Sequence, residues 1–428
     1  MPTEIVKYVD PDGGILADYT SLQAAITAEK AIRSDLVARD EVLKLMCISS
    51  AGSPDTTPVV INSGDFVTDA TRKLLIQGDN NIGIWDNSKY RLIVAASICI
   101  IPNISNIQIY NMQFANNNNF IATIDINNAT VSNIIINNNI FTTAGATGQG
   151  IEVNSSAGNI YLINNVLYGM RQGIAVFAAG GSVYIYNNTV NATELGIIGN
   201  ASATVRAKNN ISNGSSDNYF SSFHVSSDYN ISNLAGDAPG ANSLNSTTVN
   251  FADASAKDFR LLPGSPGIDQ GVNLSADPNY PFNTAIDGTL RPQGGAWDIG
   301  AFETTNAIEL ILQDINIPVN LSAGVISQAH QIIADDITIP VNLDAGIITQ
   351  IHQIVADSLN IPVALDNGNL TQTHILTIND MLVAVGLDNM TIISGSLVNG
   401  VAKLQLSITT PGVTPQITLP HIKMTMDN

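Results

Sequence analysis

The middle of the chain repeats a strand-like segment at a nearly fixed period, which limits the fold more than any other feature. Five short apolar runs carry an asparagine at the same place, and the aligned residues are Asn111, Asn138, Asn165, Asn188 and Asn210. Successive members of this set follow one another in steps of 27, 27, 23 and 22 along the sequence. Gly150, Gly173 and Gly196, each followed by isoleucine, repeat with a constant step of 23, and Ile124 precedes Ile151 by a step of 27. Two markers that share one period predict coils stacked along a common axis.

Such a coil has the size of one rung of a parallel β-helix, because it holds several short strands and no helix. Each rung pairs its backbone with the rungs above and below, about 4.8 Å away. Asparagine tolerates the left-handed backbone that a tight corner needs, and its amide can bond to the same amide one rung along. We therefore predict that each aligned asparagine serves both purposes. A low-complexity polar tract is the alternative, but the interleaved Ile, Val and Tyr alternate as buried strands do.

Residues 1–100 predict a capping helix followed by the first coils. Ser21 is a candidate N-cap, and apolar residues recur at about helical spacing before Asp40. These apolar residues are Leu22, Ile26, Ile32 and Leu36. Short apolar runs bounded by Gly, Pro, Asn and Asp then predict strands. The runs are 43–48, 59–61, 74–76 and 90–95.

Both ends of residues 5–305 carry motifs typical of one known family. The opening motifs are YVDPDGG at 8–14 and DYTSLQAAI at 18–26, with LLIQG at 74–78. The closing motifs are DFRL at 258–261, GSPGID at 264–269, DGTLRP at 287–292 and DIGAFE at 298–303. These segments resemble right-handed parallel β-helix proteins of bacteria and phages, the pectate-lyase-like superfamily. The resemblance implies an all-β fold: a right-handed parallel β-helix with an N-terminal capping helix. It implies no single activity, because such helices carry lyases, hydrolases, adhesins and inert virion parts.

The resemblance and the composition together predict how the chain is divided. Residues 1–305 form the β-helix, with the cap and first coils at 1–100, regular Asn-rich coils at 101–215 and a closing segment at 216–305. A tighter repeat with a step of 22 follows, in which Ile-Pro-Val-x-Leu begins at Ile317, Ile339 and Ile361. Each repeat predicts two strands joined near its glycine. The repeats resemble short tandem repeats of phage structural proteins, so 306–428 is predicted to be a β-repeat docking module.

Asp125 and Glu152 are the best candidates for catalysis. They are one predicted rung apart, a step of 27, and each is flanked by apolar residues, so both should point outward from the same face. Two carboxylates about 5 Å apart have the separation of a retaining glycosidase pair, and the like charges raise one pKa. The alternatives are solvated surface carboxylates or an adventitious cation site. No aromatic platform or third acid is apparent in this register, where Ala175 and Ile198 follow.

Arg171 and Glu194 also differ by one rung, here a step of 23. The family resemblance offers Arg171 as a proton-abstracting base beside a calcium ion held by carboxylates. The alternative is an ion pair across two rungs, worth about 0–1 kcal/mol if exposed. Charge is sparse for lyase chemistry, because Asp125, Glu152, Arg171 and Glu194 are the only charged residues between 101 and 205.

Three histidines keep the step of the last section: His330, His352 and His374. Stacked or symmetry-related histidines can bind zinc or a similar ion as neutral imidazoles. The alternative is a strand position that repeats because the sequence repeats, since no Cys or carboxylate shares its register. The sequence indicates no cofactor.

Charge and compartment signals narrow the partners. Lys and Arg number 17 against 36 Asp and Glu, a net charge of −19, which should repel a nucleic-acid backbone. The start shows no basic stretch followed by an apolar core, so we expect no secretory signal, and the run 92–101 is too short to span a bilayer. Cys47 and Cys99 each lie in an apolar run and are predicted to be buried free thiols.

These observations favour a structural, surface-displayed bacteriophage virion protein, such as a capsid decoration, head-fibre or tail-associated component. Its expected partners are capsid or tail proteins, bound through residues 306–428, and host-surface glycans. Family resemblance also offers a homotrimer, although no coiled-coil heptads require one. The rival interpretation is a polysaccharide lyase or glycoside hydrolase that uses Asp125 and Glu152 or Arg171.

Overall fold

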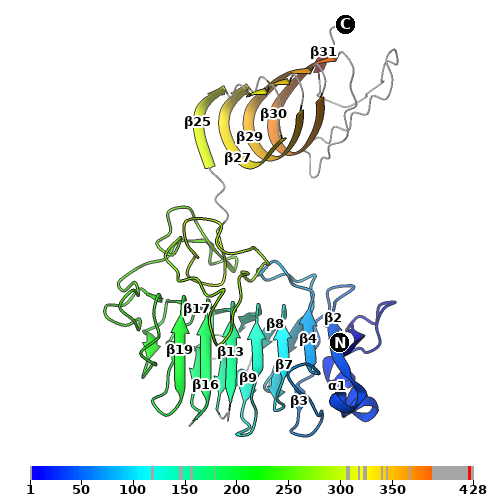
Figure 1. The fold of residues 1–428 in the computed structure, drawn as a ribbon, viewed down its shortest axis with the longest axis vertical. Coiled ribbons are helices and arrows are strands. Elements are labelled where there is room, and N and C mark those ends of the chain that lie inside the picture. Colours follow the sequence, from blue (N-terminus) through cyan, green and yellow to red (C-terminus); the bar gives the residue numbers. More distant parts are fainter. Residues whose placement is uncertain are drawn as a thin grey trace. The chain divides into compact units, whose positions relative to one another are not determined.

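The computed structural model describes residues 2–116, 120–143, 148–154, 158–178 and 180–304, together with strands between residues 309 and 425. The chain divides into two compact units, residues 1–305 and 306–428. The first unit is a right-handed parallel β-helix, in which successive rungs lay their strands side by side (Figure 1). The fold class expected from the repeats is therefore confirmed.

Each complete rung gives one strand to each of three parallel sheets. The first sheet holds β1 (Thr3–Val9), β2 (Glu41–Cys47), β4 (Leu74–Gly78), β7 (Ile107–Tyr110), β10 (Ile134–Asn137), β13 (Asn159–Ile163), β16 (Ser182–Tyr186) and β19 (Thr204–Lys208). The second holds β5 (Arg91–Val94), β8 (Gln113–Asn116), β11 (Ile140–Thr142), β14 (Val166–Tyr168), β17 (Thr189–Asn191), β20 (Ile211–Asn213) and β22 (Ile231–Ser232). The third, which we call the site sheet, holds β3 (Val59–Ile61), β6 (Ile100–Pro102), β9 (Ala122–Ile126), β12 (Gln149–Val153), β15 (Gln172–Val176), β18 (Leu195–Ile198) and β21 (Asp217–Phe220).

The interior of the site sheet is a column of isoleucines. Ile151 pairs with Ile124 on one side and Ile174 on the other, and Ile174 pairs with Ile197. All four side chains are fully buried. This is the column that the glycine–isoleucine spacing predicted. It fixes the register of the whole sheet, because a shift by one residue would turn these side chains to the solvent.

The asparagines form two columns where the sequence predicted one. Left-handed backbone occurs at Asn111, Asn138, Asn164, Asn187 and Asn209, with φ between 52° and 58°. From Asn138 onward, the residue directly after each left-handed position carries a buried amide. This second column is Asn139, Asn165, Asn188, Asn210 and Asn230, the last of which follows the left-handed Tyr229. Asn138 therefore lies beside Asn164, whose amide donates to it at 3.2 Å, and not beside Asn165 as predicted. One side chain cannot both cover the outer corner and point inward, so two adjacent residues divide the roles.

A short helical cap covers the first rungs. Helix α1 (Leu22–Arg33) begins at Ser21, whose hydroxyl accepts a hydrogen bond from the Ala24 amide at 3.2 Å. The side chains of Leu22 and Ile26, on the inner face of this helix, are fully buried. The single helix predicted to reach Asp40 is split, because Asp35 caps a second helix, α2 (Leu36–Arg39). Among the described residues, no helix is long and apolar enough to cross a membrane.

The closing segment runs back along the side of the β-helix after the antiparallel pair β23 (Phe251–Asp253) and β24 (Asp258–Leu261). The amide of Asn209 donates to the Val272 carbonyl at 2.8 Å, and that of Asn164 to the Thr284 carbonyl at 2.8 Å. Further on, Phe302 packs against Gly83, where an added Cβ would come 2.9 Å from its ring. The segment thus covers the outer asparagine column of the β-helix over several rungs.

The second unit is a stack of parallel strands whose register follows the tandem repeat. It contains β25 (Glu309–Asn316), β26 (Val319–Leu321), β27 (Val325–Thr338), β28 (Val341–Leu343), β29 (Gly346–Leu365), β30 (Gly368–Leu387) and β31 (Lys423–Thr425). The backbone of His352 pairs with that of His330 and of His374. The two strands expected in each repeat are present, although β29 continues through Pro362 into the first strand of the next repeat.

Candidate functional site

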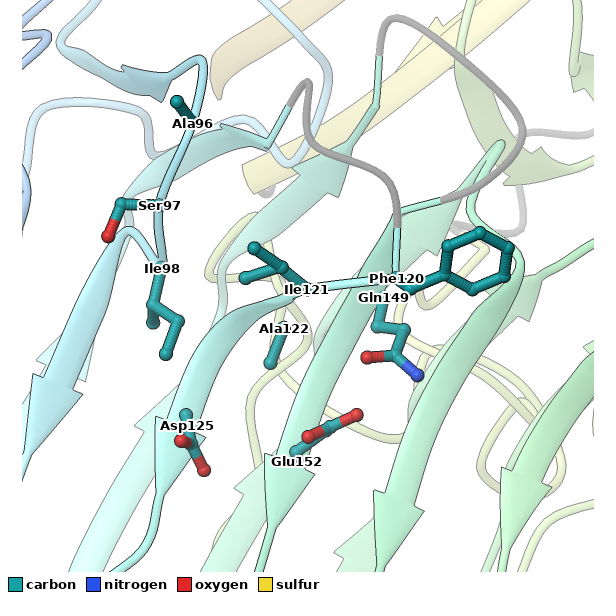
Figure 2. Close-up of a pocket in the computed structure, with 9 residues that line it drawn as sticks. All are labelled: Ala96, Ser97, Ile98, Phe120, Ile121, Ala122, Asp125, Gln149 and Glu152. Atoms are coloured by element: carbon teal, nitrogen blue, oxygen red, sulfur yellow. The ribbon is translucent and has the colours of Figure 1, made fainter.

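A pocket of about 320 Å³ opens on the outer face of the site sheet (Figure 2). Its floor comes from strands β9 and β12, and its walls come from the turns before β6 and β9. The residues that line it are Ala96, Ser97, Ile98, Phe120, Ile121, Ala122, Asp125, Gln149 and Glu152. Both carboxylates singled out in the sequence therefore lie in one pocket.

Asp125 and Glu152 are direct neighbours on adjacent rungs. A single amide links them, because Nδ2 of Asn154 donates to Oδ1 of Asp125 at 2.7 Å and to Oε2 of Glu152 at 3.1 Å. Nδ2 of Asn127 donates to the other oxygen of Asp125 at 2.8 Å. Only 8% of Asp125 is exposed. The sequence predicted the pairing, but Asn127 and Asn154, which hold both carboxylates in place, were missed.

The surroundings of Glu152 change how readily its carboxyl binds a proton. Burial raises the pKa of Glu152 above its ordinary value, and the charge of Asp125 raises it further. The amide of Asn154 and the charge of Arg171 oppose this shift. The Glu152 carboxyl therefore takes up a proton more readily than an isolated glutamate.

Arg171 lies at the rim of this pocket, paired with Glu194. Its Nη1 donates to both oxygens of the Glu194 carboxylate, at 3.1 Å and 3.0 Å. The guanidinium also lies over the Phe120 ring, 4.9 Å from its centre. The ion pair across rungs is thus present, and a base role for Arg171 would require this pair to break.

One aromatic side chain, Phe120, lies beside the carboxylates, although no aromatic platform was apparent in the sequence. Phe120 is 63% exposed and lines the pocket. The register of Glu152 continues through Ala175 and Ile198 to Phe220, which is 47% exposed. The spacing of the rungs would have revealed Phe220. Phe120 precedes β9 in a turn, where no periodic signal applies.

Two glutamine amides on adjacent rungs lie beside the carboxylates, and one of them belongs to the same strand as Glu152. Gln149 pairs in register with Gln172, and their side-chain amides lie 2.7 Å apart. Gln149 is 9% exposed and lies between Phe120 and the two carboxylates (Figure 2). Together with the hydroxyl of Ser97, it adds neutral hydrogen-bonding groups to a pocket whose other lining residues are acidic or apolar.

Among the described residues, no three His, Cys, Asp or Glu side chains lie close enough together to hold a metal ion. The backbone places His330, His352 and His374 on successive strands. Their side chains lie outside the described part of the chain. Cys47 and Cys99 are buried free thiols, as predicted.

Comparison with known proteins assigns no function to the fold described above. No family model matches the chain, and no curated protein matches it. Among solved structures, the chain is similar to the crystal structure of the pectate lyase Pel9A, with 14% sequence identity and a TM-score of 0.34. The similarity covers 71% of this chain and 97% of that one. It does not extend to an activity.

Proposed function

We propose that this chain is a structural, surface-displayed protein of a bacteriophage particle and that its β-helix binds a glycan at the Asp125–Glu152 pocket. The pocket carries the glycan part of the proposal. Its carboxylates can accept hydrogen bonds from sugar hydroxyls, and the exposed ring of Phe120 offers a flat apolar face to a sugar ring. Amides hold the carboxylates in position before any ligand arrives, which lowers the entropy cost of binding.

The hydrogen bonds and the ion pair that the charged residues of the site already make favour adhesion without cleavage. Asp125 already accepts two amide hydrogen bonds, and Arg171 is paired with Glu194. Groups fixed in this way suit recognition, whereas proton transfer requires one of them to exchange its partner during the reaction.

One observation favours cleavage as a second candidate function. Glu152 has a raised pKa and lies one rung from Asp125, an arrangement suited to a general acid beside a nucleophile. In that reaction Asp125 would attack the anomeric carbon while Glu152 protonates the glycosidic oxygen and the glycosidic bond breaks. Water deprotonated by Glu152 would then hydrolyse the bond between the sugar and Asp125. The two functions differ in whether a bound glycan is released as shorter products.

We expect Asp125→Asn and Glu152→Gln each to weaken glycan binding by about tenfold or more, because each removes a charged acceptor from a partly buried site. Glycans that bind are first selected on an array, and their affinity is then measured by calorimetry. A reducing-sugar assay on the same glycans shows whether each protein cleaves them. Glu4→Gln, an exposed carboxylate on β1, is the matched control and should leave affinity unchanged. Unaltered affinity in both pocket variants contradicts the site. If the wild type releases shorter glycans and both pocket variants do not, the protein is a glycosidase that uses these two carboxylates.

The tandem repeats support a docking role for residues 306–428. Their strands stack in register from one repeat to the next, and the repeats resemble those of phage structural proteins. A regular stack of this kind presents one surface many times, which suits attachment to a symmetric particle.

Deleting residues 306–428 should therefore abolish incorporation into phage particles while the β-helix still binds its glycan. The measurement is the number of copies per purified particle, determined by quantitative mass spectrometry. A chain that lacks the repeats and is incorporated at the normal copy number would exclude this docking role.

A further inference from the structure

Resting on the proposed glycan binding, we infer that the pocket accepts saccharides without acidic groups, neutral or amino sugars, and rejects polyuronates. Glu194 contributes to this selectivity by keeping Arg171 paired. The inference concerns the charge of the ligand, which the fold alone does not set.

The described residues that line the pocket carry negative charge and include no cation. Two of its nine lining residues, Asp125 and Glu152, are acidic, and none is a lysine or arginine. Arg171 is the only basic residue between positions 101 and 205, and its charge is matched by Glu194. The nearby surface of the site sheet therefore carries an excess of two carboxylates.

Carboxylates select for hydrogen-bond donors. Asp125 and Glu152 offer oxygens that accept from sugar hydroxyl or ammonium groups. A uronate brought to the same position would place a third carboxylate beside two that are partly buried, with no cation to balance it. Recognition of a uronate calls for an arginine fork, a lysine or a metal ion, and the lining supplies no such side chain.

The Arg171–Glu194 pair is the part of the site that could reverse this preference. Arg171 lies over the Phe120 ring and so reaches the rim of the pocket. The Glu194 carboxylate, with half of its side chain exposed, holds Nη1 of Arg171 through both oxygens. Removal of that charge would leave a guanidinium at the rim, able to pair with an acidic sugar.

The test compares acidic glycans with their own carboxyl-reduced forms, which keep the backbone and lose the charge. With the full-length protein, we expect each reduced form that binds to do so at least about tenfold more tightly than its uronate parent. Neutral and amino-sugar oligosaccharides complete the panel. A uronate bound as tightly as its reduced form overturns the inference and leaves the glycan-binding function standing. Failure to bind any glycan overturns both.

Glu194→Gln tests the paired arginine separately. We expect this variant to bind uronates at least about fivefold more tightly than the wild type and to keep its affinity for neutral glycans within about twofold. An unchanged melting temperature shows that the fold is retained, since Glu194 is half-exposed. If the preference between the acidic and reduced forms does not change, Glu194 has no part in selectivity.

Discussion

Replacement of Asn165 with alanine is expected to lower the free energy of unfolding of the β-helix by about 3–5 kcal/mol. Its side chain is fully buried and bonded on both sides. Its Nδ2 donates to Oδ1 of Asn188 at 3.0 Å and to the Ile136 carbonyl at 2.8 Å. Its Oδ1 accepts from the backbone and the side-chain amide of Asn139, both at 3.1 Å. Alanine leaves these groups buried without their partner, and urea denaturation measures the loss.

The control for this substitution is an asparagine outside the column. Asn81 is exposed, so Asn81→Ala should change the free energy of unfolding by no more than about 0.5 kcal/mol. A cost for Asn165→Ala as small as that of the control would show that the amide column does not stabilise the rungs. Asn164→Gly tests the outer column separately, because glycine adopts the left-handed backbone of Asn164 without strain and removes its side-chain hydrogen bonds.

The sequence carried enough information to predict the rungs but not the exact asparagine column. The isoleucine column was predicted correctly because each marker glycine identifies the isoleucine directly after it. The corners instead contain adjacent asparagines, such as Asn164 and Asn165, and the two are alike in the sequence. Only the pairing of Asn137 with Ile163 in the structure shows that Asn138 aligns with Asn164. A repeated residue fixes a register only where its neighbour differs from it.

The candidate site was predictable where strands form it and not where turns do. Asp125 and Glu152 follow the paired residues Ile124 and Ile151, so their spacing determined that they are neighbours. The pocket walls at 96–98 and 120–121 come from turns, whose lengths vary from rung to rung. No sequence period extends through such turns, so the pocket and the exposed Phe120 emerged only in the structure.

The closing segment shows a second limit of local reasoning. Its motifs resemble those of a closing segment over residues 216–305, and this resemblance did not predict that the segment's contacts reach back across the rungs. Asn187 donates to the carbonyls of Asp298 and Gly300, which lie far along the chain. Tyr161, Tyr184 and Trp297 are buried in the aromatic cluster between the segment and the first sheet. That sheet would otherwise present an apolar surface to water, and burying it accounts for the path of the segment.

Arg291→Met should lower the free energy that holds the closing segment against the β-helix by about 3–5 kcal/mol. The substitution removes the cation of a buried ion pair and leaves its carboxylate buried without a partner. The side chains of Arg291 and Glu303 are both fully buried, with Nη1 and Oε2 2.9 Å apart. The guanidinium also donates to the carbonyls of Asp298, Gly300 and Ala301. Hydrogen exchange measures the effect at the amide of Gly300, which bonds to the Asn209 carbonyl and should exchange at least about a hundredfold faster.

The pH dependence of that variant identifies the unpaired carboxylate as the cause. Burial already raises the pKa of Glu303, and the charge of Arg291 opposes this, so loss of the arginine should raise that pKa further. A carboxyl whose pKa is higher in the folded state binds its proton there first, so stability falls as the pH rises toward the folded pKa. Relative to the wild type, the Arg291→Met protein should therefore regain stability on acidification from about pH 7 to about pH 5, and adding Glu303→Gln should reduce that dependence. A penalty that stays constant with pH would assign the loss to the three carbonyls instead of Glu303.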